Sequence, residues 1–481
     1  MTARKHQLAA RFGAATEYDG AARIQHLVAA RLAEHIAAGA PPPARILELG
    51  CGTGFLSTHL RRLFPDADLT VTDLAPEMVA RARQRLGEDG KTRFLTLDAE
   101  DPAAAGSGYD LICSSLSMQW FADRATTLAR LAALLATGGM MGFSTLCAGS
   151  FAEWRAVHQA AGVPCATPAY PDTATLQADW PWPGQGRWQT ETLIDRPASP
   201  LAFLRELRQI GASLPRDGAR PLGAGTMRRL LAALDAQGAT QGSPRHDAQG
   251  APVTTYRIGY GMFRAPPQKG VFVTGTDTGV GKTLVSACLV RAWGARYWKP
   301  LQTGIAEEAA DADTLAALGA CAPAAIHPAF ATLAAPLSPL DAAELAGTPL
   351  DVSGIALPPP ADPRPLVVEG AGGVMVPVTA DCMMIDLIAR FALPVILVAR
   401  SGLGTINHTL LTLQALRERG IAVAGIVLNG PPSAAARRAV TQFGHTRILA
   451  EFPHLDRIGP DQVETLARTL PDFATIWRTR D

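Results

Sequence analysis

The sequence lacks the features that would tie the chain to a membrane, a secretory route or a nucleic acid. No stretch reaches 18 consecutive apolar residues, and the N-terminal segment MTARKHQLAARFGAATEYDG has no signal-peptide-like apolar core. The formal net charge is only +1, so no global field would attract nucleic acid or a membrane surface. We therefore expect a cytoplasmic protein with neither kind of partner.

Cysteine is also scarce and poorly placed for cross-linking. The seven cysteines are an odd number, lie far apart, and include no Cys-x-x-Cys pair. This pattern argues against a disulfide framework and against a zinc site, and it favours reduced thiols.

What is present is enough apolar sequence for more than one core. The chain has 481 residues, of which 48% are hydrophobic and 18% charged, as in well-buried globular proteins. Two segments start with a strand followed by a glycine-rich turn, at Arg45 and at Val271, and a Pro-Pro break at 266–267 lies between them. We expect an α/β protein of two domains, 1–265 and 270–481, each with a parallel sheet covered by helices.

The first glycine turn, ILELGCGTG, predicts a cofactor loop. Glu48 ends an apolar strand, and Gly50, Gly52 and Gly54 follow at alternate positions, where backbone amides can approach a ligand closely. A nicotinamide fingerprint would prefer GxGxxG. The next strands end at Asp73, suited to bind ribose hydroxyls, and at Asp98, suited to accept from an adenine amino group.

Strand ends in this order resemble class I (Rossmann-like) S-adenosylmethionine-dependent methyltransferases. The segments RFGAATEYD, SMQWF and FLRELRQIGASLP extend the resemblance to the malonyl-carrier O-methyltransferases of biotin synthesis, over about residues 5–264. The resemblance implies S-adenosylmethionine as cofactor, Tyr18 placed over it, and malonyl-acyl carrier protein or malonyl-CoA as acceptor. Its carboxylate is already ionised, so no general base is needed.

The second glycine turn, VFVTGTDTGVGKTLV, predicts a phosphate-binding loop. Lys282 is suited to reach the terminal phosphates of a nucleotide and Thr283 to ligate Mg²⁺. The extra lysine that partition-type ATPases carry near the start of this loop is replaced by hydroxyls and Asp277. The predicted nucleotide-binding residues follow one another along the loop: Gly279, Val280, Gly281, Lys282, Thr283 and Leu284.

The rest of this half resembles dethiobiotin synthetase over about residues 270–478. The matching segments are WKPLQTG, DADTL, VVEGAGGVMVPV, LPVILVARSGLGTINHTLLT and GIVLNG. The resemblance implies a P-loop NTPase fold that joins CO₂ to 7,8-diaminopelargonate with ATP and Mg²⁺, in a homodimer whose partner completes the substrate site.

The same resemblance implies roles for individual residues. Lys299, Lys282, Thr278 and Thr303 would stabilise the transferred phosphoryl group and the carbamate. Thr283, Asp313 and Glu369 would hold Mg²⁺ through oxygen. Asn429 would read the adenine. The diamine's carboxylate would meet free amides at a helix entry. The implied substrate residues are Gly372, Gly404, Thr405, Ile406 and Asn407.

Other readings stay open on these residues. The first half could methylate a free small carboxylic acid, or bind cofactor as a non-catalytic scaffold. The second half could be a regulatory P-loop ATPase that binds a protein partner. Asp313 and Asn407 could simply cap helices.

Overall fold

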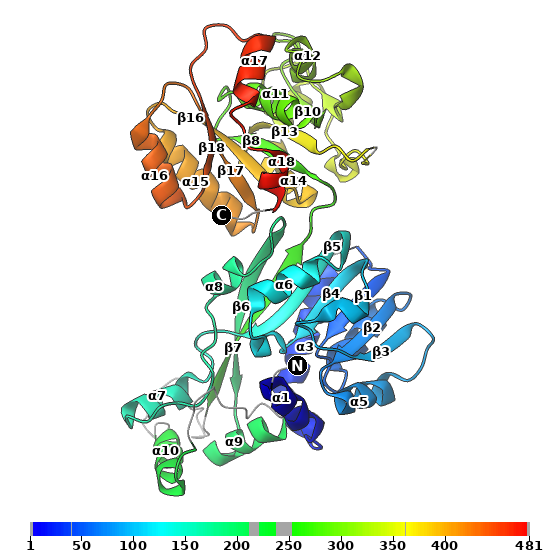
Figure 1. The fold of residues 1–481 in the computed structure, drawn as a ribbon, viewed down its shortest axis with the longest axis vertical. Helices are drawn as coiled ribbons and strands as arrows, with labels where there is room; N and C mark the ends of the chain where they lie inside the picture. Colours follow the sequence, from blue (N-terminus) through cyan, green and yellow to red (C-terminus); the bar gives the residue numbers. More distant parts are fainter. Residues whose placement is uncertain (1–2, 40, 211–220, 237–252, 361, 479–481) are drawn as a thin grey trace. The chain divides into compact units, whose positions relative to one another are not determined.

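The computed structural model describes residues 3–39, 41–210, 221–236, 253–360 and 362–478 (Figure 1). The chain forms two compact units. The first unit is Met1–Pro181 with Trp188–Phe263, and the second is Trp182–Arg187 with Arg264–Asp481. The last part of FLRELRQIGASLP, from residue 211, lies outside the described residues. Within the described part of the chain, every helix is too short or too polar to span a bilayer.

The first unit is built on a seven-stranded sheet in the order β3-β2-β1-β4-β5-β7-β6. The strands are β1 (Arg45–Leu49), β2 (Asp68–Asp73), β3 (Thr92–Thr96), β4 (Tyr109–Ser115), β5 (Leu135–Leu146), β6 (Gln185–Asp195) and β7 (Thr254–Arg264). The pairs among the first five strands are parallel, because a helical segment returns the chain between successive strands. Their carboxyl ends therefore meet at one edge.

Helices cover both faces of this sheet. They are α1 (Ala3–Gly13), α2 (Tyr18–Ala21), α3 (Arg23–Gly39), α4 (Phe55–Leu63), α5 (Pro76–Leu86), α6 (Arg124–Ala132), α7 (Ala152–Ala160), α8 (Thr173–Ala178), α9 (Pro200–Gln209) and α10 (Ala224–Ala236). One core joins apolar residues of α3 and α4 to the strands, with Leu32, Leu60 and Val71 almost fully buried.

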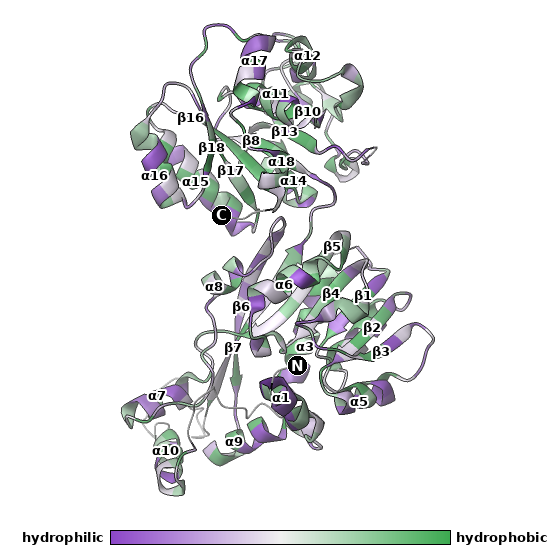
Figure 2. Ribbon diagram, viewed as in Figure 1, coloured by the Kyte–Doolittle hydropathy of each residue, from purple (hydrophilic) through white to green (hydrophobic). Residues whose placement is uncertain are grey.

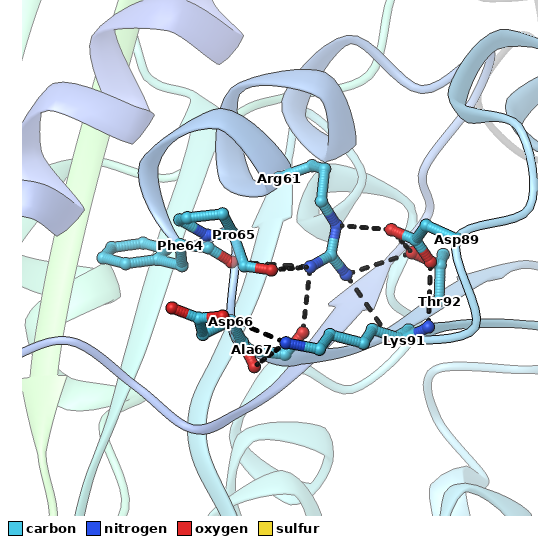
Figure 3. Close-up of polar contacts among 8 residues, drawn as sticks. All are labelled: Arg61, Phe64, Pro65, Asp66, Ala67, Asp89, Lys91 and Thr92. Atoms are coloured by element: carbon cyan, nitrogen blue, oxygen red, sulfur yellow. Dashed lines mark hydrogen bonds and ion pairs between the residues drawn. The ribbon is translucent and has the colours of Figure 1, made fainter.

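One arginine ties together the turns at the amino ends of β2 and β3, as Figure 3 shows. Arg61, in the last turn of α4, donates to the carbonyl oxygens of Pro65 (3.1 Å) and Ala67 (3.0 Å). It also donates to Thr92 Oγ1 (3.0 Å) and forms an ion pair with Asp89 (3.1 Å). A planar guanidinium with five N–H donors can satisfy several turn carbonyls at once. These contacts hold the end of the sheet opposite the glycine loop.

The second unit has a seven-stranded parallel sheet in the order β11-β9-β13-β8-β16-β17-β18. These strands are β8 (Gly270–Gly275), β9 (Arg296–Trp298), β11 (Ile326–His327), β13 (Leu366–Gly373), β16 (Val395–Arg400), β17 (Val423–Asn429) and β18 (Ile448–Phe452). Short strands form two further pairs: β10 (Leu301–Gln302) with β12 (Ala331–Thr332), and β14 (Pro377–Thr379) with β15 (Cys382–Met383).

Successive residues of these strands enter different cores, one on each face of the sheet. Val271 and Val273 pack toward α11, whereas Phe272 packs on the other face. Figure 2 shows the strands as mostly hydrophobic and the covering helices as mixed. The helices are α11 (Lys282–Trp293), α12 (Asp311–Ala317), α13 (Pro339–Leu345), α14 (Met384–Phe391), α15 (Thr405–Glu418), α16 (Ala434–Gly444), α17 (Pro460–Ala467) and α18 (Phe473–Arg478). The predicted α/β fold class is confirmed, with parallel pairs among the first five strands of the first sheet and a parallel second sheet.

Candidate active sites

The first candidate site is a cavity at the carboxyl edge of the first sheet. The predicted residues Tyr18, Gly50, Gly52, Asp73 and Asp98 all line it. The cavity is also lined by side chains of α1 and of the segment that follows β4, which were not among the predicted cofactor residues: Lys5, Leu8, Phe12, Leu116 and Trp120. The N-terminal helix thus supplies one wall of the site.

Asp73 is fixed by the loop that it faces. Its Oδ2 accepts from the backbone N–H of Gly52 (2.9 Å), and its Oδ1 accepts from that of Ala75 (2.8 Å). Burial raises the pKa of Asp73, although these backbone bonds oppose the shift. Each oxygen keeps a lone pair for a further donor, so the carboxylate can still bind hydroxyl groups.

Gly50 needs its missing side chain. Its φ is +63°, and a Cβ there would lie 2.6 Å from the Cβ of Ser117. Any larger residue would push the loop and the segment after β4 apart, on the wall of the cavity.

Glu48 and Gly54 are not among the residues that line the cavity, and their contact with the cofactor stays a prediction. Glu48 is 1% exposed, and its Oε2 has no hydrogen-bond partner among the described residues. Burial raises its pKa to about 8. Gly54 begins α4 with φ +91°, and a Cβ there would lie 3.4 Å from Ala82 of α5. Both residues therefore support the loop from behind.

A lysine that the sequence analysis missed holds Asp98. Lys5 Nζ donates to Asp98 Oδ2 (2.6 Å) and pairs with Glu100 Oε2 (2.5 Å). Burial tends to lower the pKa of Lys5, but the two carboxylates raise it overall. No short motif could reveal this contact, because Lys5 and Asp98 are 93 positions apart. Asp98 therefore meets a cation of α1 at the position where an adenine amino group was expected.

The second helix is anchored to the same glycine loop. Thr53 Oγ1 donates to Asp19 Oδ1 at 2.6 Å, and Arg85 of α5 pairs with the other oxygen of Asp19. Tyr18 thereby lies beside Gly52, with its hydroxyl 3.5 Å from where a Cβ would be. Burial raises the pKa of Tyr18, and Asp73 adds to the effect, so its phenol stays protonated. Phe12 meets Trp120 edge to face at 5.9 Å between ring centroids.

The second candidate site begins at the phosphate-binding loop between β8 and α11. Gly279 and Gly281 have positive φ, and Gly281 caps α11. Lys282 is 7% exposed, and its Nζ donates to the backbone oxygen of Asp277 at 3.1 Å, curling back over the loop. Burial lowers the pKa of Lys282, with Lys299 contributing. The amides of this turn and the lysine form a cradle for an anion.

Four polar side chains converge behind Lys282. Thr283 Oγ1 donates to Glu369 Oε1 (3.1 Å) and to Asp311 Oδ1. Lys299 Nζ donates to Glu369 Oε1 (3.1 Å) and pairs with Asp311. Burial would lower the pKa of Lys299, but Glu369 and Asp311 raise it. We call Thr283, Asp311, Glu369 and Lys299 the carboxylate–lysine cluster.

The oxygens of this cluster suit a hard divalent cation. Two carboxylates and one hydroxyl lie at the start of the helix that follows the phosphate-binding loop, and such oxygen ligands are those that Mg²⁺ prefers. Within the described residues no group of three or more His, Cys, Asp or Glu side chains forms a protein-only metal cage. A metal held here would therefore share its coordination with phosphate or water.

The acidic residue of α12 that faces Thr283 is Asp311 and not the predicted Asp313. Asp311 is the first residue of α12 and faces Thr283, whereas Asp313 is exposed. Two residues along a helix turn the side chain through about 200°, so Asp311 and Asp313 cannot face the same point. Asp311 is therefore the acidic residue of this segment that belongs to the carboxylate–lysine cluster.

Asn429 supports the phosphate-binding loop from the end of β17. Its Nδ2 donates to the carbonyl oxygen of Val280 at 2.9 Å, and a Cβ on Gly281 would lie 2.1 Å from that nitrogen. Val280, Gly281 and Asn429 line a cavity of about 460 Å³ together with Leu284 and Arg400. This cavity lies next to the anion cradle and is large enough for a base and a sugar.

The remaining predicted residues lie at three places in the second unit. Thr278 is exposed on the loop and Thr303 is half-buried just after β10. Gly372 lies in β13 with φ +64°. The others lie at the start of α15, where Gly404 is the N-cap, Thr405 is buried, and Ile406 and Asn407 are exposed.

Comparisons with known proteins agree with both halves. A family model described as "Methyltransferase domain" matches residues 47–141, and one described as "AAA domain" matches residues 269–462. A "Biotin biosynthesis bifunctional protein BioCD" from Bordetella avium is 47% identical over 98% of this chain and 97% of its own length.

Single-function relatives match each half separately. An "ATP-dependent dethiobiotin synthetase BioD" from Paramagnetospirillum magneticum is 54% identical over 40% of this chain and 90% of its own length. A "Malonyl-[acyl-carrier protein] O-methyltransferase" from Magnetococcus marinus is 39% identical over 52% of this chain and 90% of its own length.

Proposed function

This chain belongs to the family of bifunctional biotin-biosynthesis proteins, and from that premise we propose what each half does. The first unit methylates the free carboxyl group of a malonyl thioester with S-adenosylmethionine. The second unit closes the ureido ring of dethiobiotin from 7,8-diaminopelargonate, CO₂ and ATP. The observation that carries the proposal is a 47% identical bifunctional relative that spans both units.

In the first unit the protein's task is to bind, orient and exclude water. Asp73 offers two acceptor oxygens to the ribose hydroxyls of the cofactor, while Tyr18 and Trp120 contribute apolar wall. The acceptor carboxylate attacks the donor's methyl carbon directly, so alignment and desolvation supply the rate enhancement. Asp98 and Glu100, neutralised by Lys5, supply acceptors for the adenine end.

In the second unit the lysines compensate charge. One amine of the substrate reacts with CO₂ and forms a carbamate. An oxygen of the carbamate then attacks the γ-phosphate of ATP, and ADP leaves. The second amine then displaces phosphate and closes the ring. Lys282 lies over the loop, and Lys299 lies beside it, where charge grows on the phosphoryl group and the carbamate. Thr278 and Thr303 would act as further donors.

Thr283, Asp311 and Glu369 would hold Mg²⁺. A bound Mg²⁺ would neutralise phosphate charge and align the nucleotide. This assignment rests on the oxygen donor set of the carboxylate–lysine cluster. Asn429 would reach the adenine from the same cavity that holds Val280.

We also propose that the second unit works as a homodimer. Leu403 is fully exposed, and Ile406 and Leu411 are 38% and 57% exposed along the start of α15. Such an apolar stretch favours burial against a second copy. The partner's α15 would then offer free backbone amides to the substrate's distant carboxylate. Cytoplasmic location stays a prediction.

The test takes the purified chain and assays each half separately. Malonyl-acyl carrier protein, malonyl-CoA and small dicarboxylic acids are each incubated with S-adenosylmethionine, and mass spectrometry looks for one added methyl group. Methylation of a malonyl thioester supports the proposal, whereas methylation of free acids alone, or of nothing, overturns it for the first unit.

The second unit is tested with 7,8-diaminopelargonate, bicarbonate, ATP and Mg²⁺. Dethiobiotin formed in step with phosphate release is the expected result. Phosphate release that ignores the diamine would instead indicate a regulatory ATPase.

A further inference from the structure

The two oxygens of Glu369 have different partners. Oε1 accepts from Thr283 Oγ1 and Lys299 Nζ, both at 3.1 Å, and so faces the carboxylate–lysine cluster. Oε2 accepts from the hydroxyl of Tyr297 at 3.0 Å. Glu369 and Tyr297 are both 0% exposed. The tyrosine therefore holds the side of the carboxylate that points away from the phosphate-binding loop.

Strand register places Tyr297 at this point. β9 and β13 are parallel neighbours, and Tyr297 lies opposite Val367. Side chains two residues apart on a strand share a face, so Tyr297 and Lys299 lie on the face that carries Val367 and Glu369. Trp298 packs into the core on the opposite face. Tyr297 and Lys299 thus approach the same carboxylate from one strand.

The hydroxyl of Tyr297 is needed to satisfy a buried charge. A buried carboxylate oxygen without a donor is costly, and a phenol has one proton to donate. A tyrosine phenol is ordinarily protonated at neutral pH, so that proton is available to Oε2. A phenylalanine at this position would fill the same space and leave Oε2 without this donor.

We propose that Tyr297 is a positioning residue for metal binding, which fixes the rotation of the Glu369 carboxylate so that Oε1 faces the cation. The inference rests on the proposed function, because it takes Glu369 as a ligand of Mg²⁺. Partners that orient a metal ligand typically change metal affinity about 10–100-fold when removed. Tyr297 does not touch the reacting atoms itself.

The test compares Tyr297→Phe with Tyr109→Phe in the full chain. Tyr109 is a matched control, since it is 2% exposed and its hydroxyl donates to Ala105 O at 2.7 Å in the other unit. Mn²⁺ replaces Mg²⁺, and electron paramagnetic resonance measures free Mn²⁺ in the presence of ADP. Calorimetry measures ADP binding in EDTA.

We expect Tyr297→Phe to weaken Mn²⁺ binding about tenfold, with ADP binding in EDTA unchanged and Tyr109→Phe like wild type. Wild-type Mn²⁺ affinity in Tyr297→Phe, with only a lower melting temperature, would overturn the inference. Failure of the wild-type chain to bind Mn²⁺ with ADP, or to form dethiobiotin, would instead contradict the proposed function.

A second measurement covers the case in which Tyr297→Phe does not fold. Tyr297 is replaced by 3-fluorotyrosine, which keeps the hydroxyl, and its ¹⁹F resonance is recorded before and after Mg²⁺ and ADP are added together. A shift that ADP in EDTA does not produce supports the coupling between the phenol and the cation. An unchanged resonance overturns it.

Discussion

The two candidate sites treat buried charge in opposite ways. In the first unit, burial raises the pKa of Asp73 on the cavity wall, and it raises that of Glu48 behind the glycine loop to about 8. In the second unit, carboxylates and lysines neutralise one another. Lys299 keeps a raised pKa, and that of Asp311 is lowered overall, although burial alone would shift both in the opposite direction.

The difference follows the charge of the ligands that each site must bind. A sulfonium donor is a cation, and the cavity wall that the structure describes carries three carboxylates, Asp73, Asp98 and Glu100, against one lysine, Lys5. A nucleotide and a carbamate are anions, and they require cations that are fixed before the ligand arrives. Glu369 and Asp311 fix Lys299 in the absence of ligand, whereas a backbone carbonyl oxygen fixes Lys282.

The strongest way to break this comparison is to remove a cation from the second site. Lys282→Ala takes away the charge that curls over the phosphate-binding loop. We expect dethiobiotin formation to fall by about 10²–10³-fold in kcat, because the growing charge on the phosphoryl group loses its nearest compensation. The assay is single-turnover product formation, with methyl transfer by the same sample as the folding control. A loss of methyl transfer as well would indicate misfolding of the variant, whereas unchanged dethiobiotin formation would contradict the role of the Lys282 charge.

The next effect separates two neighbouring acids. Asp311→Asn should weaken Mn²⁺ binding in the presence of ADP about 10-fold or more, because Asp311 bonds to Thr283 and pairs with Lys299. Asp313→Asn is the matched control on the exposed side of α12 and should bind like wild type. The reverse order of effects would restore Asp313 as the ligand.

Much of the fold and of both glycine loops could be predicted from the spacing of residues along the sequence. Gly50, Gly281, Asp73 and Lys282 were predicted because each lies within a few residues of a strand end, and strand ends of a parallel sheet meet at one edge. The same logic placed Glu369 beside Thr283. These are features in which neighbouring positions in sequence stay neighbours in space.

Contacts between residues far apart in the sequence could not be predicted in this way. Lys5 meets Asp98 across 93 positions, and Tyr297 meets Glu369 across 72. The choice between Asp311 and Asp313 depends on where α12 begins, and helix ends are uncertain by one or two residues from sequence alone. Gly54 has φ +91°, which favours glycine, and this conformation could not be read from the sequence.

A pH experiment sharpens the view of the first site. The pKa of Glu48 rises from an ordinary 4.5 to about 8 on folding, so the native state holds a proton that the unfolded chain loses. Stability of the first unit should fall as pH rises from about 4.5 to about 8 and then level off.

Glu48→Gln should remove this dependence and be more stable than wild type at pH 8, by about 1–3 kcal/mol. The chain is equilibrated in urea and treated briefly with a protease. The release of peptides from residues 45–115 then reports the unfolding of the first unit separately from the second. Parallel pH profiles for the variant and wild type would contradict the buried, protonated state of Glu48.

The smallest effect concerns Lys5, the cation among the described residues that line the first cavity. Lys5 neutralises Asp98 and Glu100 with its side chain 18% exposed, and it joins α1 to the end of β3. Lys5→Met keeps an apolar stem but leaves two carboxylates facing each other. Partly exposed ion pairs contribute roughly 0.2–1 kcal/mol, so S-adenosylhomocysteine should bind up to about fivefold more weakly by calorimetry. Lys91→Met is the matched control, because Lys91 pairs with the exposed Asp66 away from the cavity (3.0 Å). Tighter binding in Lys5→Met would contradict this expectation. It would show that Lys5 competes with the adenine amino group for Asp98.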